Sequence, residues 1–202
     1  LADTRHDIAN ALIRAIVAQG LRPPTVDEAI ASIGWGVPAL VVKALGPDQN
    51  DAVDRVQQAF REDYRRNIVV DTEVYEGMET LLHDLRGRGV TLAVATNKPG
   101  ALTRLLLREL GLAPLFDHVL APEDVLRPKP APDMLRLLLD RCHIGPEEAV
   151  MVGDMETDVD SARAASVRAV LVTYSGFVRP EGLAETADDV ATTVDELRDL
   201  LL

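Results

Sequence analysis

The stretch that decides the fold is Ala149-Val150-Met151-Val152-Gly153-Asp154-Met155-Glu156-Thr157-Asp158, in which an apolar run ends at a glycine and carboxylates follow. Four consecutive apolar residues suit a strand of a parallel sheet, because helices cover both faces of such a sheet and neither face needs polar side chains. A helix is predicted next, over 157–165. The stretch therefore predicts a buried strand with acidic side chains at its carboxyl end.

The same alternation of strand and helix continues on both sides of this stretch. Further apolar runs predict strands at 90–95, 118–120, 167–172 and 189–191, and periodic patterns predict helices at 100–110, 132–142 and 194–201. This alternation is typical of α/β proteins with a doubly wound parallel sheet. We therefore expect residues 71–202 to form an α/β core domain.

The segment 4–67 has a different pattern. Ile8, Leu12 and Ile16 recur every four residues, as on one face of an amphipathic helix, and Thr25-Val26-Asp27-Glu28 is typical of a capping box. Further helices are predicted over 37–45 and 51–66. Nothing in this segment alternates with the period of a strand. Residues 4–70 are therefore predicted to form a helical domain inserted near the N-terminus of the core.

Composition excludes several classes of protein. The chain has 202 residues, of which 47% are hydrophobic, so it can bury a sizeable core. Its net charge of −12 opposes nucleic-acid binding, and no apolar run approaches the ~18 residues of a membrane span. Cys142 is the only cysteine, which excludes an intrachain disulfide and fits a reducing compartment. We expect a cytoplasmic monomer or homodimer whose partner is a small molecule.

Polar side chains follow three of the predicted strands. Thr96-Asn97-Lys98 follows the first, Lys129 lies between two prolines in the loop after the second, and Asp154 follows the third. The carboxyl ends of parallel strands share one edge, so hydroxyl, amide, ammonium and carboxylate groups converge there. This set suits a phosphate beside a divalent metal.

Each of these residues also has a structural explanation. Asp154 suits the N-cap of a helix, Lys129 a solvated loop, and Thr96 the end of a strand. The pair Asp154 and Asp158 argues for a metal, because like charges four residues apart on a helix repel each other unless a cation such as Mg²⁺ lies between them.

Three of these segments resemble motifs two, three and four of the haloacid dehalogenase superfamily: Thr96-Asn97-Lys98, Lys129-Pro130-Ala131-Pro132-Asp133, and Gly153-Asp154 with Asp158. The segment Ile33-Gly34-Trp35-Gly36 is similar to the cap of phosphoglycolate phosphatases within that superfamily. The resemblance covers essentially the whole chain. It implies a Rossmann-like core, an inserted α-helical cap and a Mg²⁺ cofactor. It also implies hydrolysis of a small phosphomonoester through an aspartyl-phosphate, with phosphoglycolate as the first candidate substrate.

The resemblance also implies roles for the core residues. Thr96 and Lys129 would hold the transferring phosphoryl group, with Asn97 beside the substrate. Asp154 would coordinate Mg²⁺, and Asp158 would support Lys129 and the water shell of the metal.

Substrate selection is expected of the cap, because the core motifs recognise only phosphate and metal. Gly34, Trp35 and Gly36 combine backbone freedom with a large rigid side chain. We therefore expect these three residues to face the cleft lined by Thr96, Lys129 and Asp154.

One motif of the superfamily is not found in this sequence. Asp-x-Asp-Gly-Thr carries the nucleophile and the general acid and ends the central strand, and Leu1-Ala2-Asp3-Thr4 looks like the residues that immediately follow it. A sheet without its central strand would leave unpaired backbone edges in the core, which is costly. We expect the natural polypeptide to carry this strand before Leu1.

Two alternatives follow from the sequence. A chain that truly lacks the first motif would be a non-catalytic binding or regulatory protein on the same fold. A sugar phosphatase, phosphonatase or phosphoglucomutase would keep the fold and change the substrate. A phosphonatase needs a lysine in the cap, and Lys43 is the only lysine in that segment.

Overall fold

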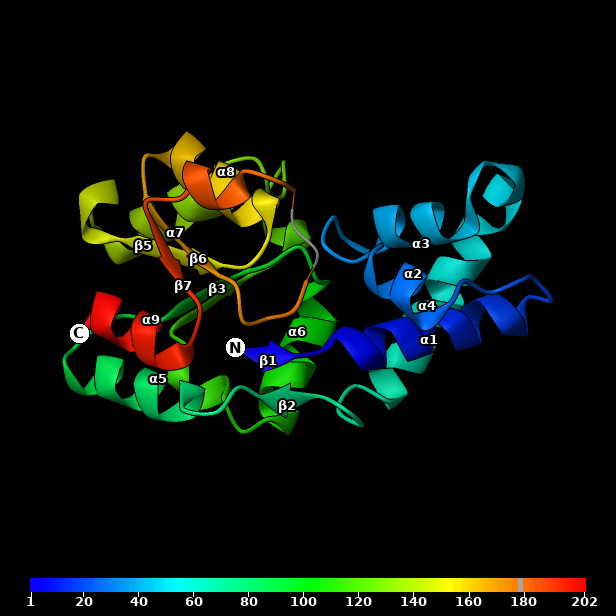
Figure 1. The fold of residues 1–202 in the computed structure, drawn as a ribbon, viewed down its shortest axis with the longest axis horizontal. Helices are drawn as coiled ribbons and strands as arrows, with labels where there is room; N and C mark the ends of the chain where they lie inside the picture. Colours follow the sequence, from blue (N-terminus) through cyan, green and yellow to red (C-terminus); the bar gives the residue numbers. More distant parts are fainter. Residues whose placement is uncertain (178–179) are drawn as a thin grey trace.

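The computed structural model describes residues 1–177 and 180–202, which form a helical domain beside an α/β domain (Figure 1). The helical domain, called the cap below, comprises α1 (Arg5–Ala18), α2 (Val26–Ile30), α3 (Val37–Leu45), a short 3₁₀ helix η1 (Pro47–Ala52) and α4 (Val53–Arg66). Within the described part of the chain, no helix is long and apolar enough to cross a membrane.

The cap is held together by the apolar faces of its helices. Ile8, Leu12 and Ile16 of α1 are buried against Phe60 and Tyr64 of α4, as the spacing of the α1 residues predicts. The predicted capping box is present at the start of α2. The helix expected over 51–66 begins at 53, because residues 47–52 form the 3₁₀ turn. Two leucines of the core helix α6 join this cluster, so the cap rests on the core.

The second domain alternates strands and helices and confirms the predicted α/β fold. Its strands and α-helices are β1 (Ala2–Asp3), β2 (Glu73–Val74), α5 (Met78–Gly87), β3 (Ala93–Ala95), α6 (Gly100–Glu109), β4 (His118–Leu120), α7 (Asp133–Cys142), β5 (Val150–Gly153), α8 (Glu156–Ala165), β6 (Arg168–Val172), β7 (Asp189–Ala191) and α9 (Val194–Leu201). Short 3₁₀ helices lie at Ala113–Leu115, Pro122–Asp124, Pro146–Glu148 and Leu183–Thr186.

Helices cover both faces of the sheet. On β6, Val170 and Val172 belong to the hydrophobic cluster of α5 and α9, whereas Ala169 and Leu171 belong to the cluster of α7 and α8. Successive side chains of a strand point to opposite faces, so an uninterrupted apolar strand packs against two layers of helices. This is the doubly wound arrangement that the apolar runs predict.

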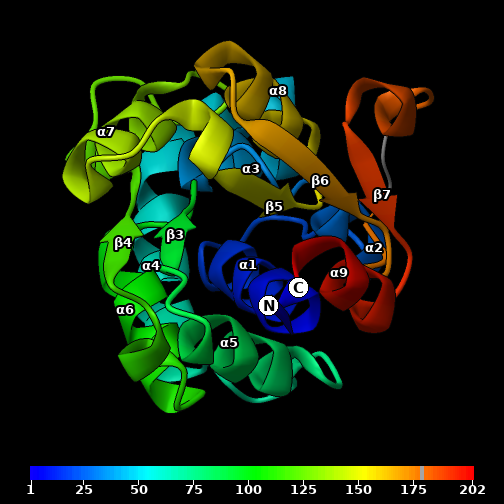
Figure 2. The ribbon, with the colours of Figure 1, turned by 90° about the vertical axis from the view of Figure 1, so that its left-hand side faces the viewer.

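The parallel strands form two separate ladders. β3 pairs with β4, and β5 pairs with β6, which pairs with β7. In the described residues the other edge of β3 and the other edge of β5 have no strand partner (Figure 2). A cavity of about 750 Å³ is lined by residues of both strands. We call this cavity the slot. It lies where the expected central strand belongs.

The strand predicted over 90–95 is shorter than expected. It begins at Ala93, because the backbone N–H of Val90 donates to the carbonyl of Leu85 and closes the end of α5. The β4 strand and the α9 helix have the predicted bounds.

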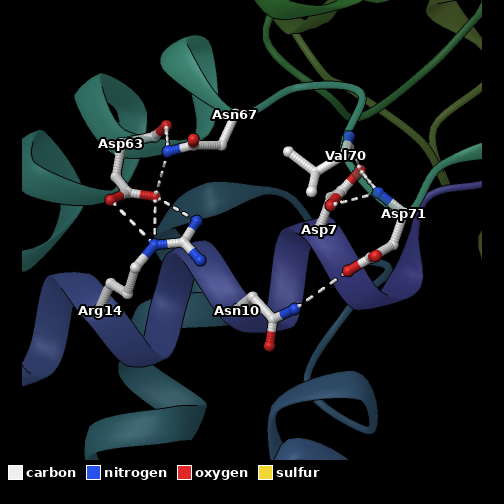
Figure 3. A network of polar contacts seen from close by, with 7 residues as sticks. All are labelled: Asp7, Asn10, Arg14, Asp63, Asn67, Val70 and Asp71. Carbon is white, nitrogen blue, oxygen red and sulfur yellow. Dashed lines mark hydrogen bonds and ion pairs between the residues drawn. The ribbon is translucent and has the colours of Figure 1, made fainter.

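The chain passes between the cap and the core twice, at the start of α1 and after α4. Asp7 of α1 bonds these two connecting segments to each other (Figure 3). Its carboxylate accepts hydrogen bonds from the backbone N–H groups of Val70, Asp71 and Thr72 at 2.9–3.1 Å and from the Thr72 hydroxyl at 2.7 Å. Nearby, Asn10 contacts Asp71. The start of α1 and the segment after α4 are therefore fixed to each other.

Candidate active site at the carboxyl edge of the sheet

The predicted site residues lie around one end of the slot. Thr96 and Asn97 follow β3, Asp154 follows β5, and Lys129 comes from the loop before α7, and all four line the cavity. The two strand ends bring together groups that are 58 residues apart in sequence (96 to 154). The expected convergence of these side chains is therefore present in the structure.

Lys129 and Asp158 form a buried ion pair. The Lys129 ammonium donates to Asp158 Oδ1 at 2.5 Å and to the Ala95 carbonyl at 2.6 Å, and Lys129 is 7% exposed. Asp158 Oδ2 accepts the backbone N–H groups of Asp154 and Met155, each at 3.0 Å. Gly153 is required here, because a side chain at this position would collide with Asp158. The pair holds a positive charge at a defined point of the cavity wall.

Thr96 is fixed by hydrogen bonds on both sides. Its backbone N–H donates to the Leu120 carbonyl at 3.1 Å, which continues the β3–β4 ladder. Its hydroxyl accepts the backbone N–H of Lys98 at 3.0 Å, so the hydroxyl proton can be donated to a ligand. Lys129 bonds to the carbonyl of the preceding residue, Ala95. The hydroxyl and the ammonium therefore lie on adjacent parts of one rim.

Asn97 connects the core to the cap. Its Nδ2 donates to the Lys129 carbonyl at 2.9 Å and to the Gly34 carbonyl at 3.4 Å. Because both donors point to carbonyls, the orientation of the amide is determined. Oδ1 is buried and has no hydrogen-bond partner among the described residues. A buried acceptor of this kind suits a hydroxyl or N–H of a ligand.

Asp154 supplies the carboxylate at the end of β5. Burial raises the pKa of Tyr174 to about 12, and the charge of Asp154 adds to this effect. No cluster of three or more potential metal ligands is found among the described residues. A Mg²⁺ ion needs fewer, since it is commonly held by one or two carboxylates, phosphate oxygens and water. Asp154 therefore fits part of a Mg²⁺ shell, whereas Asp158 is already engaged by Lys129.

The three cap residues are divided between two cavities. Gly34 and Gly36 line the slot, and both have positive φ angles, +131° and +86°. A Cβ on Gly36 would lie 3.3 Å from the Asn97 carbonyl oxygen, so the glycine allows the cap loop to approach the core. Trp35 is 51% exposed and is not among the residues of the slot. The expectation that all three face the slot is therefore wrong for Trp35.

Trp35 lines a second, neighbouring cavity of about 310 Å³, which we call the side pocket. Asn97 and Gly36 line both cavities, so the two adjoin. Arg61 of α4 and Glu123 also line the side pocket. Arg61 is an exposed residue of α4, and the periodicity of the helix carries no signal for its position beside Trp35.

Lys98, which follows β3, and Glu123, which follows β4, have other partners. The Lys98 ammonium turns away to the cap and donates to the Tyr64 hydroxyl. Glu123 accepts the backbone N–H of Gly100 at the start of α6. Of the ammonium groups expected at this edge, Lys129 is the one that bonds to the end of β3 and to the loop after β5.

Comparisons with known proteins agree with this geometry. Residues 1–172 match the family model described as haloacid dehalogenase-like hydrolase. The chain is 32% identical to phosphoglycolate phosphatase 1 of Pseudomonas aeruginosa, covering 100% of this chain and 75% of that protein. It is also 32% identical to N-acetylmuramic acid 6-phosphate phosphatase of Pseudomonas putida, covering 90% and 81%.

The solved structures show the same fold. A crystal structure from Haemophilus somnus, described as a predicted phosphoglycolate phosphatase, superimposes with a TM-score of 0.92 at 22% identity, over 100% of this chain and 93% of that chain. The family match covers both the cap and the strand ends that carry Thr96, Lys129 and Asp154. The chain belongs to the haloacid dehalogenase-like hydrolases.

Proposed function

We propose that this protein is a Mg²⁺-dependent phosphomonoester hydrolase that acts on a small phosphorylated metabolite. Phosphoglycolate is the first candidate substrate. The observation that carries the proposal is the buried Lys129–Asp158 pair, which holds an ammonium at the ends of the strands that Thr96 and Asp154 follow. A fixed cation, a hydroxyl donor and a metal-binding carboxylate on one rim suit a phosphoryl group. Similarity to the phosphoglycolate phosphatase of P. aeruginosa supports the choice of substrate.

In this proposal, the rim residues bind the transferring phosphoryl group. Thr96 donates its hydroxyl proton to one phosphoryl oxygen, and Lys129 neutralises another. Asp158 keeps Lys129 aimed, because it is bonded to the ammonium and to two backbone N–H groups. Charge that grows on the phosphoryl oxygens in the transition state therefore meets a cation that needs no reorganisation.

Asp154 would hold the Mg²⁺ ion, together with phosphate oxygens and water. The bound ion would neutralise negative charge on the phosphate. The engaged oxygens of Asp158 support a contact through water rather than direct ligation.

We place the nucleophile on a strand before Leu1 that fills the slot. The unpaired edges of β3 and β5 support this placement, because a parallel strand between them would complete the sheet. Its carboxyl end would lie beside Thr96 and Asp154. In that arrangement an aspartate would attack phosphorus, the bond from phosphorus to the alcohol oxygen would break, and the general acid of the same motif would give the alcohol its proton. Water would then cleave the aspartyl-phosphate, which releases inorganic phosphate and regenerates the carboxylate.

A sugar phosphate is the second candidate substrate. The side pocket beside Asn97 offers about 310 Å³ for a leaving group larger than glycolate. The buried Oδ1 of Asn97 would accept a hydrogen bond from a hydroxyl of such a group. Similarity to the N-acetylmuramic acid 6-phosphate phosphatase of P. putida supports this candidate.

The proposal also covers the location of the protein in the cell and its oligomeric state. The net charge of −12 and the single cysteine support a cytoplasmic protein that acts on small metabolites rather than on nucleic acid. A monomer or homodimer is sufficient, since all the rim residues come from one chain.

The test is a phosphate-release assay of the full-length protein with phosphoglycolate, N-acetylmuramic acid 6-phosphate and an aryl phosphate. Activity should disappear in a chelator and return with Mg²⁺, and Asp154→Asn should remove it. Full activity in chelator would contradict the metal assignment. No hydrolysis of any substrate, with phosphate binding retained, would identify a non-catalytic binding protein.

A further inference from the structure

Lys98 contacts the cap and the phosphate-binding loop at the same time. Its backbone N–H donates to the Thr96 hydroxyl at 3.0 Å. Its ammonium donates to the Tyr64 hydroxyl on α4 at 2.6 Å and lies 4.8 Å from the centre of the Tyr64 ring. A single residue therefore joins the group that we assign to phosphate binding to a helix of the other domain.

The cap end of this contact is rigid. Tyr64 is 1% exposed, and its ring stacks on Phe60 at a centroid distance of 5.6 Å. Both rings belong to the hydrophobic core of the cap. Lys98 is thus attached to the packed interior of the cap rather than to a surface side chain, so its position reports the position of the whole cap.

Lys98 is half-buried at the contact between the cap and the core. Burial lowers the pKa of Lys98 to about 7, although the charge of Asp7 on α1 opposes this effect. None of the salt bridges between described residues includes Lys98. An ammonium that is partly removed from water and has no carboxylate partner among the described residues contributes little to stability, and such groups concentrate at functional sites.

The preceding residue makes a second contact with the cap. Asn97 donates to the Gly34 carbonyl at 3.4 Å, on the loop where Gly36 approaches the core. Asn97 and Lys98 therefore reach two different parts of the cap, the loop after α2 and the helix α4. Both follow directly after Thr96, so a shift of the cap is carried to the phosphate-binding loop from two directions.

We propose that Lys98 is a positioning residue that aligns the Thr96 loop with the cap, so that the phosphoryl group is held correctly only when the cap is seated on the core. This inference rests on the proposed function. The ammonium acts on the reaction through the backbone of its own loop and does not touch the substrate. The ionisable groups that act on it are Tyr64, whose pKa burial raises above its usual range, and Asp7.

The test compares Lys98→Met with Lys98→Arg and Tyr64→Phe in the full-length protein. Methionine keeps the apolar stem and removes the charge, so kcat for phosphoglycolate should fall by roughly 10- to 100-fold, the range of a lost charge-assisted hydrogen bond, with little change in KM. Arginine should restore part of kcat, because it also donates to Tyr64 and can lie over the ring. Tyr64→Phe should cause a smaller loss, and no further loss when Lys98 is already methionine.

A stability measurement separates positioning from a structural role. Lys98→Met should unfold at the same urea concentration as the wild type or a higher one, because it removes a desolvated charge. The matched control is Lys43→Met, which removes an exposed cap lysine bonded to the Ala31 carbonyl and should keep wild-type kinetics. Unchanged kcat in Lys98→Met, or a loss that follows a loss of stability, would overturn the inference.

A binding measurement keeps this inference distinct from the proposed function. Trp35 is the only tryptophan and lies on the cap loop, so its fluorescence reports the environment of the cap. Inorganic phosphate with Mg²⁺ should change this fluorescence in the wild type and change it much less in Lys98→Met. Equal responses would refute the coupling. An inactive wild type would refute the proposed function alone.

Discussion

At the scale of single residues, the Lys129–Asp158 pair has a structural role in addition to the chemical role that we propose for it. Both side chains are less than a tenth exposed, and Asp158 also caps the start of α8 through Asp154 and Met155. Removal of one partner leaves the other charge buried without compensation, which typically costs about 3–5 kcal/mol. The two partners differ in how many bonds each keeps when the other is lost.

Asp158→Ala should therefore lower the free energy of unfolding by about 3–5 kcal/mol, measured by urea denaturation. The substitution leaves the buried Lys129 ammonium without its carboxylate partner and leaves two backbone N–H groups without their acceptor. Lys129→Met should cost less stability, because Asp158 keeps its backbone bonds. It should nevertheless lower the rate of hydrolysis ~10²–10³-fold. Equal stability losses in the two variants would show that the backbone bonds of Asp158 contribute nothing.

Lys98 should make stability depend on pH in a characteristic direction. Its pKa is about 7 in the folded protein and near ~10.4 when unfolded, so between these values the unfolded chain binds more protons. The destabilising contribution of Lys98 is therefore present at neutral pH and diminishes as the pH rises. The stability gained in Lys98→Met should be larger at pH 7 than at pH 10, and a gain independent of pH would contradict the lowered pKa.

At the scale of elements, the connection between cap and core depends on Asp7. Burial alone would raise the pKa of its carboxyl, but the bonds from Thr72 and from the backbone N–H groups of Val70, Asp71 and Thr72 outweigh burial and lower it. The carboxylate thus ties the first helix of the cap to the segment that returns to the core. Figure 3 shows the same stretch of α1 bonded farther along to α4 through Arg14 and Asp63.

Asp7→Asn should destabilise the protein by about 1.5–3 kcal/mol at pH 7, the range of hydrogen bonds to a charged group. A lowered pKa means that this stabilisation is complete above the unfolded value, ~3.9, and is lost as the pH falls through the folded value. The gap between variant and wild type in urea denaturation should therefore close in acid. Asp63→Asn is the control, because it removes a solvent-accessible pair with Arg14 worth ~0–1 kcal/mol.

At the scale of the whole molecule, two cavities meet where the cap loop approaches the core. The rim that we propose to bind phosphate lies at one end of the slot, and the side pocket adjoins the slot at Asn97. We assign phosphate chemistry to the first cavity and recognition of the leaving group to the second. A small leaving group does not need the side pocket, whereas a sugar does.

Trp35→Ala should therefore lower kcat/KM for a sugar phosphate more than for phosphoglycolate. The aromatic wall of the side pocket contacts only a leaving group large enough to enter it. Steady-state kinetics on both substrates measure the ratio. Equal losses on both would assign Trp35 to packing of the cap loop.

The local patterns of the sequence were sufficient for the type and order of most elements. The α3 and α9 helices and the capping box at Thr25 follow their patterns, because they depend on contacts three or four residues apart. The convergence of Thr96, Lys129 and Asp154 followed from the rule that parallel strands end at one edge. These features need no knowledge of which domains touch.

The tertiary structure alone decided where the long side chains go. Lys98 and Asp7 meet partners 34 and 63–65 residues away, and Trp35 lies in the side pocket rather than the slot. Each of these positions depends on how the cap packs against α6 and the strand ends. Periodicity assigns a residue to a face of its own element, but the partner of a flexible side chain is selected by the packing of whole domains, which contacts within one element do not encode.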